Sequence, residues 1–384
     1  MKFLLFSHIS PPATDGGSRL LSQIGQHLSK NHTVETLSSD CQSTDDFINP
    51  RSKSQKNGLP VYKFLYRPFK LLSLIFPSIL IFAKGPIFKF IPLVKTIIKI
   101  QKFKPDFVIA GPFPTTIPIY ALIFSRLINP RPKLILIPCF HFSDPVFSKN
   151  ILLNILRQAD FIWSLTGFET TMYINKFGIH SNHILTLGAS IDIDTTPLPK
   201  PKIGNQNLLY VGSFAAHKGI DVLIDSFSAL SKKFSSLSLT LAGHPTLYSP
   251  FIYQKIQKLP KNLTQRITVI PNFKDCKLAA IIDKCSILVL PSKQESFGLV
   301  LLEAMSRKKP IITSDIPALA EMVDCSRAGK TFSINHPSDL KNVLDELLQD
   351  PTLRQKLGLC GYKYLQNSCN WDKIIDNLCQ NIYP

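Results

Sequence analysis

The chain has 384 residues, which is too long for a single domain with one ordinary hydrophobic core. Because 45% of the residues are hydrophobic and 18% are charged, the chain is too apolar to be disordered. Its 29 Pro and 17 Gly exclude the collagen and coiled-coil classes. The 44 Lys and Arg exceed the 26 Asp and Glu and give a net charge of +18, which favours contact with nucleic acid, an acidic lipid surface or a phosphorylated substrate. We therefore expect two domains and an anionic partner.

The first half of the chain alternates between short apolar runs and segments of helical length. Buried strands are predicted at residues 3–6, 33–37, 107–110, 134–137 and 161–165. A turn-rich stretch at residues 10–18 joins the first strand to an amphipathic helix that carries Leu20, Leu21, Ile24 and Leu28. This alternation is typical of a parallel sheet wrapped by helices.

The first residues and the cysteines indicate the compartment. Residues 1–8 hold too few apolar side chains for a signal peptide. The eight cysteines include no Cys-x-x-Cys pair, so a zinc site is not expected. A reducing cytoplasm fits these features best.

Residues 61–104 have the most unusual composition in the chain. They contain no Asp or Glu, and phenylalanines are interleaved with nine basic residues, Lys63, Arg67, Lys70, Lys84, Lys89, Lys95, Lys99, Lys102 and Lys104. The most apolar part, residues 71–83, is interrupted by Pro77 and falls short of the roughly 20 residues that cross a bilayer. The composition favours a peripheral membrane face over single-stranded nucleic acid. The alternative is a set of buried helices with a solvated basic edge.

The second half of the chain repeats the alternation. A Pro-rich connection at residues 195–202 precedes it, and the segments 221–233 and 278–284 are predicted helices. Strands are predicted at residues 208–211, 237–242, 267–270, 287–290 and 310–313. We expect an α/β protein with two doubly wound, Rossmann-like domains, 1–196 and 197–370, which face each other across a cleft. Ligands in such sheets bind beyond the carboxyl ends of the strands.

The most informative motif lies at residues 291–305, which follow a predicted strand and open a helix near Gly298. Free backbone N–H groups and the dipole at such a helix start favour an anion such as a diphosphate. Glu295 lies in the loop and Glu303 lies more than one turn inside the helix. Two carboxylates accept hydrogen bonds strongly, and sugars are rich in donors.

With this motif the sequence resembles the retaining glycosyltransferases of family 4, which have the GT-B fold. The resemblance runs over nearly the whole chain. It rests on Gly16-Gly17 with Arg19, His141, Ala159-Asp160, Gly188 with Ile191-Asp192, Tyr210-Val211-Gly212 with Lys218-Gly219, Ala242-Gly243, the Glu295 to Glu303 element and Trp371. It implies that the last segment, 371–384, crosses back to pack on the first domain.

The resemblance also implies the roles of individual residues. Glu295 would hold hydroxyls of the donor sugar, Glu303 the ribose, and Lys218 the diphosphate, whose growing charge a fixed cation stabilises. His141 would line the cleft close to the transferred sugar, and together with Lys218 and Glu295 it forms the catalytic set. The donor-binding set comprises Gly16, Gly17, Gly212, Lys218, Glu295, Ser296, Phe297, Gly298, Leu299 and Glu303. The acceptor and membrane side is assigned Arg19, Lys63, Arg67 and Lys70.

Three features depart from the family pattern or offer another reading. The family usually has Arg or Lys two to four residues before the lysine of its Lys-Gly pair, where this chain has Ser213 to His217. The turn after the Glu303 helix, commonly Gly-rich, is Arg307-Lys308-Lys309. Asp192-x-Asp194 has the look of a metal-binding pair, but the resemblance makes it a structural turn, and we expect neither a metal nor a cofactor.

The expected reaction is transfer of a hexosyl unit from a UDP- or GDP-linked sugar to an acceptor hydroxyl with retention of configuration. The expected acceptor is a lipid-linked or cell-envelope glycan at the cytoplasmic face of a membrane whose surface is anionic, and nucleic acid is not an expected partner. Two alternatives stay open. One is a catalytically silent GT-B scaffold that binds a membrane or a polyanion, and the other is a GT-B epimerase or phosphorylase.

Overall fold

The computed structural model describes residues 1–7, 16–39, 61–64, 90–144, 147, 150–193, 196–198, 206–273 and 277–383. Arg67, Lys70 and Asp194 lie outside the described residues, as does most of the basic segment (65–89). Lys63 lies in a described strand whose side chains are not described. Among the described residues, no helix combines the length and the apolar character needed to cross a membrane.

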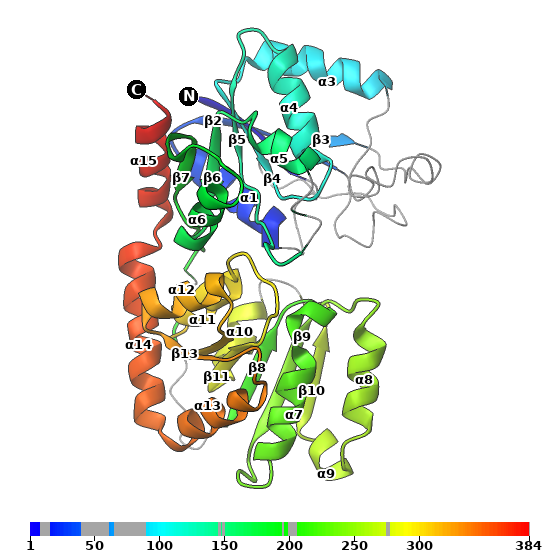
Figure 1. The fold of residues 1–384 in the computed structure, drawn as a ribbon, viewed down its shortest axis with the longest axis vertical. Coiled ribbons are helices and arrows are strands. Elements are labelled where there is room, and N and C mark those ends of the chain that lie inside the picture. Colours follow the sequence, from blue (N-terminus) through cyan, green and yellow to red (C-terminus); the bar gives the residue numbers. More distant parts are fainter. Residues whose placement is uncertain are drawn as a thin grey trace. The chain divides into compact units, whose positions relative to one another are not determined.

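The chain forms two compact units, whose elements are labelled in Figure 1. The N-terminal unit comprises Met1–Ala189 and Trp371–Pro384, and the C-terminal unit comprises Ser190–Asn370. The boundary therefore falls before the Pro-rich stretch at which the sequence analysis places it. Ser190 is buried, and its Oγ donates a hydrogen bond to the carbonyl oxygen of Cys369 at 2.6 Å. This bond joins the first residue of the C-terminal unit to its last but one.

The N-terminal unit is built on a seven-stranded parallel sheet in the order β3-β2-β1-β4-β5-β6-β7. Its strands are β1 (Lys2–Ser7), β2 (Thr33–Ser39), β3 (Val61–Phe64), β4 (Phe107–Gly111), β5 (Lys133–Leu136), β6 (Phe161–Ser164) and β7 (Ile184–Thr186). Its helices are α1 (Gly16–Leu28), α3 (Phe90–Phe103), α4 (Ile117–Leu127), α5 (Asn150–Leu156), α6 (Gly167–Asn175) and α15 (Trp371–Ile382), with the 3₁₀ turn η4 (Ser181–His183). The central strands are apolar on both faces because helices cover both.

The last helix, α15, packs against α1 within the N-terminal unit. Its apolar face is buried, and the Trp371 ring stacks on the His27 ring with centroids 5.4 Å apart. The Lys30 ammonium lies 3.0 Å from Asp372 Oδ1 at the edge of this contact. The final helix of the chain thus completes the unit that the first residues begin.

The C-terminal unit contains a six-stranded parallel sheet in the order β10-β9-β8-β11-β12-β13. Its strands are β8 (Asn207–Val211), β9 (Ser238–Gly243), β10 (Ile267–Pro271), β11 (Ile287–Leu290), β12 (Ile311–Ser314) and β13 (Gly329–Phe332). Its helices are α7 (Ile220–Leu230), α8 (Ser249–Gln257), α9 (Lys261–Thr264), α10 (Leu278–Asp283), α11 (Leu299–Ser306), α12 (Pro317–Ser326), α13 (Ser338–Gln349) and α14 (Pro351–Ser368), with the 3₁₀ turn η5 (Ala216–Lys218). The two doubly wound domains that the sequence predicts are confirmed.

The order of the strands reverses once in each sheet. In the N-terminal unit the reversal lies between β1 and β4, and in the C-terminal unit it lies between β8 and β11. The connections on either side of such a switch point run to opposite faces of the sheet, so the loops that follow the two strands part and leave a crevice for a ligand. The switch between β8 and β11 therefore locates the candidate site in the C-terminal unit.

Candidate functional site

The candidate site is formed by two loops at the carboxyl ends of β8 and β11. The first loop, residues 212–219, leads from β8 to α7, and the second, residues 291–298, leads from β11 to α11. A backbone hydrogen bond of 2.7 Å from the Lys293 N–H to the His217 carbonyl joins them. Both loops carry residues that the resemblance assigns to the donor.

Lys218 and Glu295 meet between these loops. The Lys218 Nζ lies 2.7 Å from Glu295 Oε2, and the two side chains are only 15% and 13% exposed. The Ser296 N–H donates to the other carboxylate oxygen, Oε1, at 3.3 Å. At this degree of burial a charge pair is held more strongly than on an open surface. A cation and a carboxylate are thus fixed at the switch point.

Tyr210, the last but one residue of β8, is buried close enough to Glu295 to be affected by its charge. Its hydroxyl donates to the Ser213 carbonyl at 2.8 Å. Burial raises the pKa of Tyr210 well above its usual range, and the negative charge of Glu295 raises it further. Tyr210 therefore stays a neutral donor. A Cβ on Gly212 would lie 2.7 Å from the Tyr210 hydroxyl, so this ring also limits what residue 212 can be.

Two glycines, Gly219 and Gly298, have backbone conformations that shape the two loops. Gly219 has φ +66°, and a Cβ at this position would lie 2.0 Å from the Pro291 carbonyl oxygen. Gly298 has φ +80° and precedes the first residue of α11, Leu299. Both residues lie in the left-handed region, which glycine enters without the steric cost that a side chain imposes. The sequence prediction of a helix start near Gly298 is confirmed.

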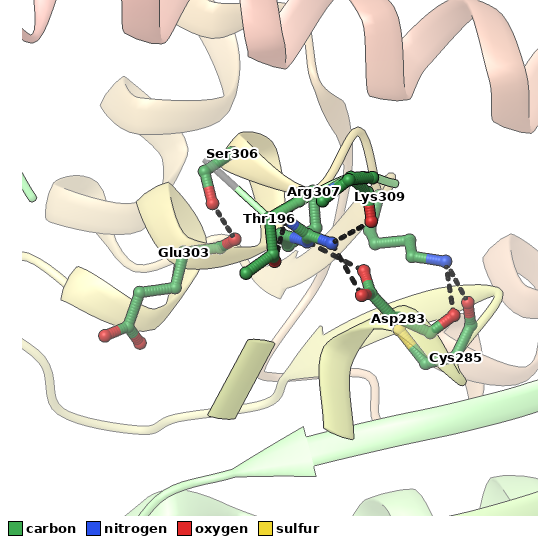
Figure 2. A network of polar contacts seen from close by, with 8 residues as sticks. Thr196, Asp283, Cys285, Glu303, Ser306, Arg307 and Lys309 are labelled. Atoms are coloured by element: carbon green, nitrogen blue, oxygen red, sulfur yellow. Dashed lines mark hydrogen bonds and ion pairs between the residues drawn. The ribbon is translucent and has the colours of Figure 1, made fainter. Parts of the chain in front are cut away.

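Two predicted donor-binding residues, Phe297 and Glu303, are buried at or in α11. Phe297 lies just before the helix start, and Glu303, which is 8% exposed, lies within the helix. Figure 2 shows the Glu303 carboxylate directed away from the network that surrounds Arg307. Only the backbone carbonyl of Glu303 takes part in the contacts drawn there, since it accepts from Ser306 Oγ at 2.7 Å.

Arg307, in the turn that departs from the family pattern, is a structural clamp. It is 2% exposed, and its guanidinium donates to both carboxylate oxygens of Asp283, from Nε at 2.8 Å and from Nη2 at 2.6 Å. Its Nη1 donates to the Thr196 carbonyl at 2.9 Å (Figure 2). Lys309 Nζ donates to the Asp283 and Cys285 carbonyls. The turn therefore ties Thr196, near the start of the C-terminal unit, to the end of α10.

The remaining predicted residues lie in the N-terminal unit. His141 follows β5 and is partly buried, with its ring 5.6 Å from that of Phe147. Gly16 and Gly17 are the first two residues of α1, and Arg19 is partly buried in the same turn. A Cβ on Gly17 would lie 2.7 Å from Pro112 Cγ, whereas a Cβ on Gly16 would meet nothing within 4 Å. Packing against Pro112 thus explains Gly17, whereas a side chain on Gly16 would contact none of the described residues.

The C-terminal unit therefore brings together Gly212, Lys218, Glu295, Ser296, Phe297, Gly298 and Leu299 on its two loops. Glu303 belongs to the helix that follows the second loop. The described residues contain no group of three or more His, Cys, Asp or Glu placed to hold a metal ion.

Glu169 is a buried acid that none of the sequence motifs above predicted. It is 2% exposed on α6 and accepts hydrogen bonds from two backbone N–H groups and from the Tyr173 hydroxyl. Its spacing from the helix cap Thr166, three residues earlier, is that of a capping box, and this signal could have drawn attention to it.

Comparison with protein families matches residues 199–364 to the model "Glycosyl transferases group 1". An uncharacterized glycosyltransferase of Methanocaldococcus jannaschii is 33% identical over 168 residues, 44% of this chain and 45% of that protein. The glycogen synthase of Mycobacterium tuberculosis is 25% identical over 222 residues, 57% of this chain and 53% of that protein. The chain thus spans about half the length of these curated relatives.

Solved structures match the fold of the entire chain. HepE of Anabaena, in complex with UDP and glucose, matches with a TM-score of 0.74 at 16% identity. The match covers 100% of this chain and 99% of the HepE chain. A mutant of TarM from S. aureus, in complex with Fondaparinux, alpha-GlcNAc-glycerol and UDP, has a TM-score of 0.74 at 13% identity and covers 100% of both chains. The likeness confirms the predicted GT-B fold class.

Proposed function

Because residues 199–364 match the family model "Glycosyl transferases group 1", we propose that the chain is a retaining glycosyltransferase. It moves a hexosyl unit from a nucleotide diphosphate sugar to an acceptor hydroxyl. The observation that carries this proposal is the pairing of the Lys218 ammonium with the Glu295 carboxylate, 2.7 Å apart, at the switch point of a doubly wound sheet. A donor of this class needs a cation for its diphosphate and a hydrogen-bond acceptor for its sugar hydroxyls.

The donor-binding proposal follows from the groups at the two loops. Lys218 holds the diphosphate, and the free N–H groups at the start of α11 add donors for the same anion. Glu295 binds hydroxyls of the transferred sugar, and Glu303 binds the ribose. HepE and TarM carry UDP in the structures named above, which supports a uridine nucleotide ahead of a guanosine nucleotide.

The chemistry requires little more than placement and charge. The leaving diphosphate and the acceptor hydroxyl react on one face of the sugar. Lys218 stabilises the charge that grows on the diphosphate as the glycosidic bond breaks, and His141 lies close to the transferred sugar. Gly16 leaves room for the phosphates at the start of α1, since a Cβ at this position would meet nothing within 4 Å.

We extend the proposal to a lipid-linked or cell-envelope glycan as the acceptor. Nine basic residues and no acid in residues 61–104 suit an anionic membrane surface on the cytoplasmic side. Arg19, Lys63, Arg67 and Lys70 are the proposed contacts. Flotation of the full chain with vesicles tests this part: binding that depends on anionic lipid and weakens with salt supports it, and binding indifferent to both contradicts it.

A panel of UDP- and GDP-linked sugars tests the donor. Because a ligand that binds the native state raises its stability, the cognate donor should raise the melting temperature of the wild-type protein and not of Lys218→Ala. Transfer to a glycan acceptor should then be lost in Lys218→Ala. Failure of every sugar nucleotide to stabilise the wild type would instead favour the silent scaffold, and interconversion of a sugar nucleotide without acceptor would indicate an epimerase.

A further inference from the structure

Glu169 links two loops of the N-terminal unit. Its carboxylate is buried, and Oε2 accepts from the Leu165 N–H at 2.7 Å and from Ser164 Oγ at 3.4 Å. Oε1 accepts from the Tyr173 hydroxyl at 2.6 Å and from the Phe140 N–H at 3.2 Å. Three of these donors lie on β6 and α6 or between them. The fourth, Phe140, belongs to the loop that follows β5, so Glu169 ties that loop to α6.

The Phe140 N–H holds an unusual piece of backbone in place. Cys139 has φ +52°, a conformation that a residue with a side chain adopts at an energetic cost. Just before it, the Pro138 carbonyl accepts from the Phe113 N–H at 3.0 Å. The bonds to Pro138 and Phe140 therefore flank Cys139 and fix its conformation. The next residue after this fixed segment is His141.

The helix cap alone does not explain the position of the Glu169 carboxylate. Thr166 caps α6, and its hydroxyl accepts from the Glu169 N–H at 3.0 Å. In a capping box the glutamate would return the bond to the N–H of the cap residue. Here the carboxylate turns to Leu165 and Phe140 instead. Burial raises the pKa of Glu169, and the bonds from Leu165, Tyr173, Phe140 and Ser164 oppose that rise.

We propose that Glu169 is a positioning residue for glycosyl transfer, because its bond to the Phe140 N–H sets the backbone that presents His141 to the reacting sugar. The inference rests on the proposed function, in which His141 lies next to the transferred sugar. Glu169 itself has no contact with substrate in this proposal. A small displacement of a group near the reacting atoms costs rate even where binding is unchanged.

Glu169→Gln breaks this tie selectively. The amide NH₂ cannot accept a hydrogen bond, so one of the two backbone N–H groups loses its partner. The shorter bond, to Leu165, retains the oxygen, and the NH₂ then faces Phe140 and the Tyr173 hydroxyl, which can turn and accept. Tyr173→Phe is the matched control, since it removes a bond to the same carboxylate oxygen and spares the Phe140 N–H.

The first measurement is amide hydrogen exchange at Phe140, which needs no activity. We expect exchange to be about ten-fold faster or more in Glu169→Gln and near wild type in Tyr173→Phe, because only the first frees this N–H. The second is steady-state transfer well below the melting temperature of either variant. Here kcat should fall about ten-fold or more in Glu169→Gln with the donor KM little changed, and stay within about two-fold of wild type in Tyr173→Phe.

The outcomes separate this proposal from the one on which it rests. Unchanged exchange at Phe140, normal kcat in Glu169→Gln, or an equal fall of kcat in Tyr173→Phe each overturns the positioning role. A wild-type protein that transfers no sugar from any donor overturns the proposed function, and with it the role of Glu169 in transfer.

Discussion

The Lys218 Nζ lies 2.7 Å from Glu295 Oε2, in a pair that is mostly withdrawn from solvent. Each charge would be left without this partner if the other were removed. Glu295→Ala should therefore lower the free energy of unfolding of the C-terminal unit by about 1–3 kcal/mol, between the values for exposed and buried pairs. Transfer should fall roughly ten- to hundred-fold, as expected when a charged hydrogen bond to the donor is lost.

Calorimetry and a transfer assay with the cognate donor test these values. Glu295→Gln is the control for stability, because its amide oxygen can still accept from Lys218. Full transfer by Glu295→Ala would exclude the role that we propose for this carboxylate.

Gly219 should tolerate no side chain. Its φ of +66° brings strain to any other residue, and a Cβ added here would clash with the Pro291 carbonyl oxygen at 2.0 Å. Gly178 is a matched control, since it has φ +64° and a Cβ added there would meet nothing within 4 Å. We expect Gly178→Ala to cost about 1–2 kcal/mol of stability and to keep transfer activity. Gly219→Ala should lose donor binding, measured by thermal shift, because the two loops must separate; equal donor binding in the two variants would contradict this.

Substitution of Gly17 should lower stability, whereas substitution of Gly16 should weaken donor binding. Gly17→Ala places a methyl group 2.7 Å from Pro112 Cγ, so we expect a loss of about 1–3 kcal/mol in the free energy of unfolding. In Gly16→Ala the added methyl group contacts no neighbour, so stability should be nearly unchanged. Donor binding should be weaker, because the methyl group occupies space that the phosphates need. Denaturant unfolding and donor titration of both variants distinguish the two effects. Unaltered donor affinity in Gly16→Ala would remove Gly16 from the donor site.

Arg307 should be essential for the stability of the C-terminal unit. Its guanidinium is 2% exposed and bonds to both Asp283 oxygens and to the Thr196 carbonyl. Arg307→Ala leaves a carboxylate without its partner, and we expect a loss of about 3–5 kcal/mol. Arg307→Lys cannot form the forked contact and should recover only part of this. Unfolding of both variants, followed by calorimetry, checks the order; a stable Arg307→Ala would contradict it.

Alkaline pH should destabilise the fold through Cys285. Burial raises the pKa of this thiol from 9.0 to about 12. The folded state then keeps its proton where the unfolded state has lost it, so stability is fully present below pH 9 and is lost as pH rises towards 12. The expected slope from this group is about 1.4 kcal/mol per pH unit. In Cys285→Ala, the free energy of unfolding should fall less steeply between pH 9 and 12, by about 1.4 kcal/mol per pH unit. The same slope in the variant and the wild type would contradict this role of Cys285.

The three strands that the sequence did not predict all lie at edges of the two sheets, whereas the fourth edge strand, β10, was predicted. Residues 3–6 and 107–110 are continuous apolar runs because helices cover both faces of the central strands. The missed strands, β3, β7 and β13, are short and lie at the ends of their sheets. In β13 only Phe332 is fully buried, so neither a long apolar run nor a strict alternation marks it.

The candidate site shows the same division between local and distant signals. The loop with Glu295 and the helix start at Gly298 follow from neighbouring residues, and both were predicted. The burial of Arg307 depends on Asp283 and Thr196, which a reading of the adjacent Arg-Lys-Lys turn does not reveal. Glu169 likewise looks like a surface glutamate until the fold brings Phe140 to it. Charged residues whose partners lie far away in the sequence were therefore missed.

The packing of α15 on α1 has a consequence for how the protein is made. During translation, residues Met1–Ala189 leave the ribosome first. The N-terminal unit to which they belong cannot include α15 until Trp371–Ile382 have also emerged. The C-terminal unit, although synthesised later, is continuous along the chain and has all of its residues before that point. Folding during translation can thus finish the second unit before the first, while the part of α1 that packs on α15 stays uncovered.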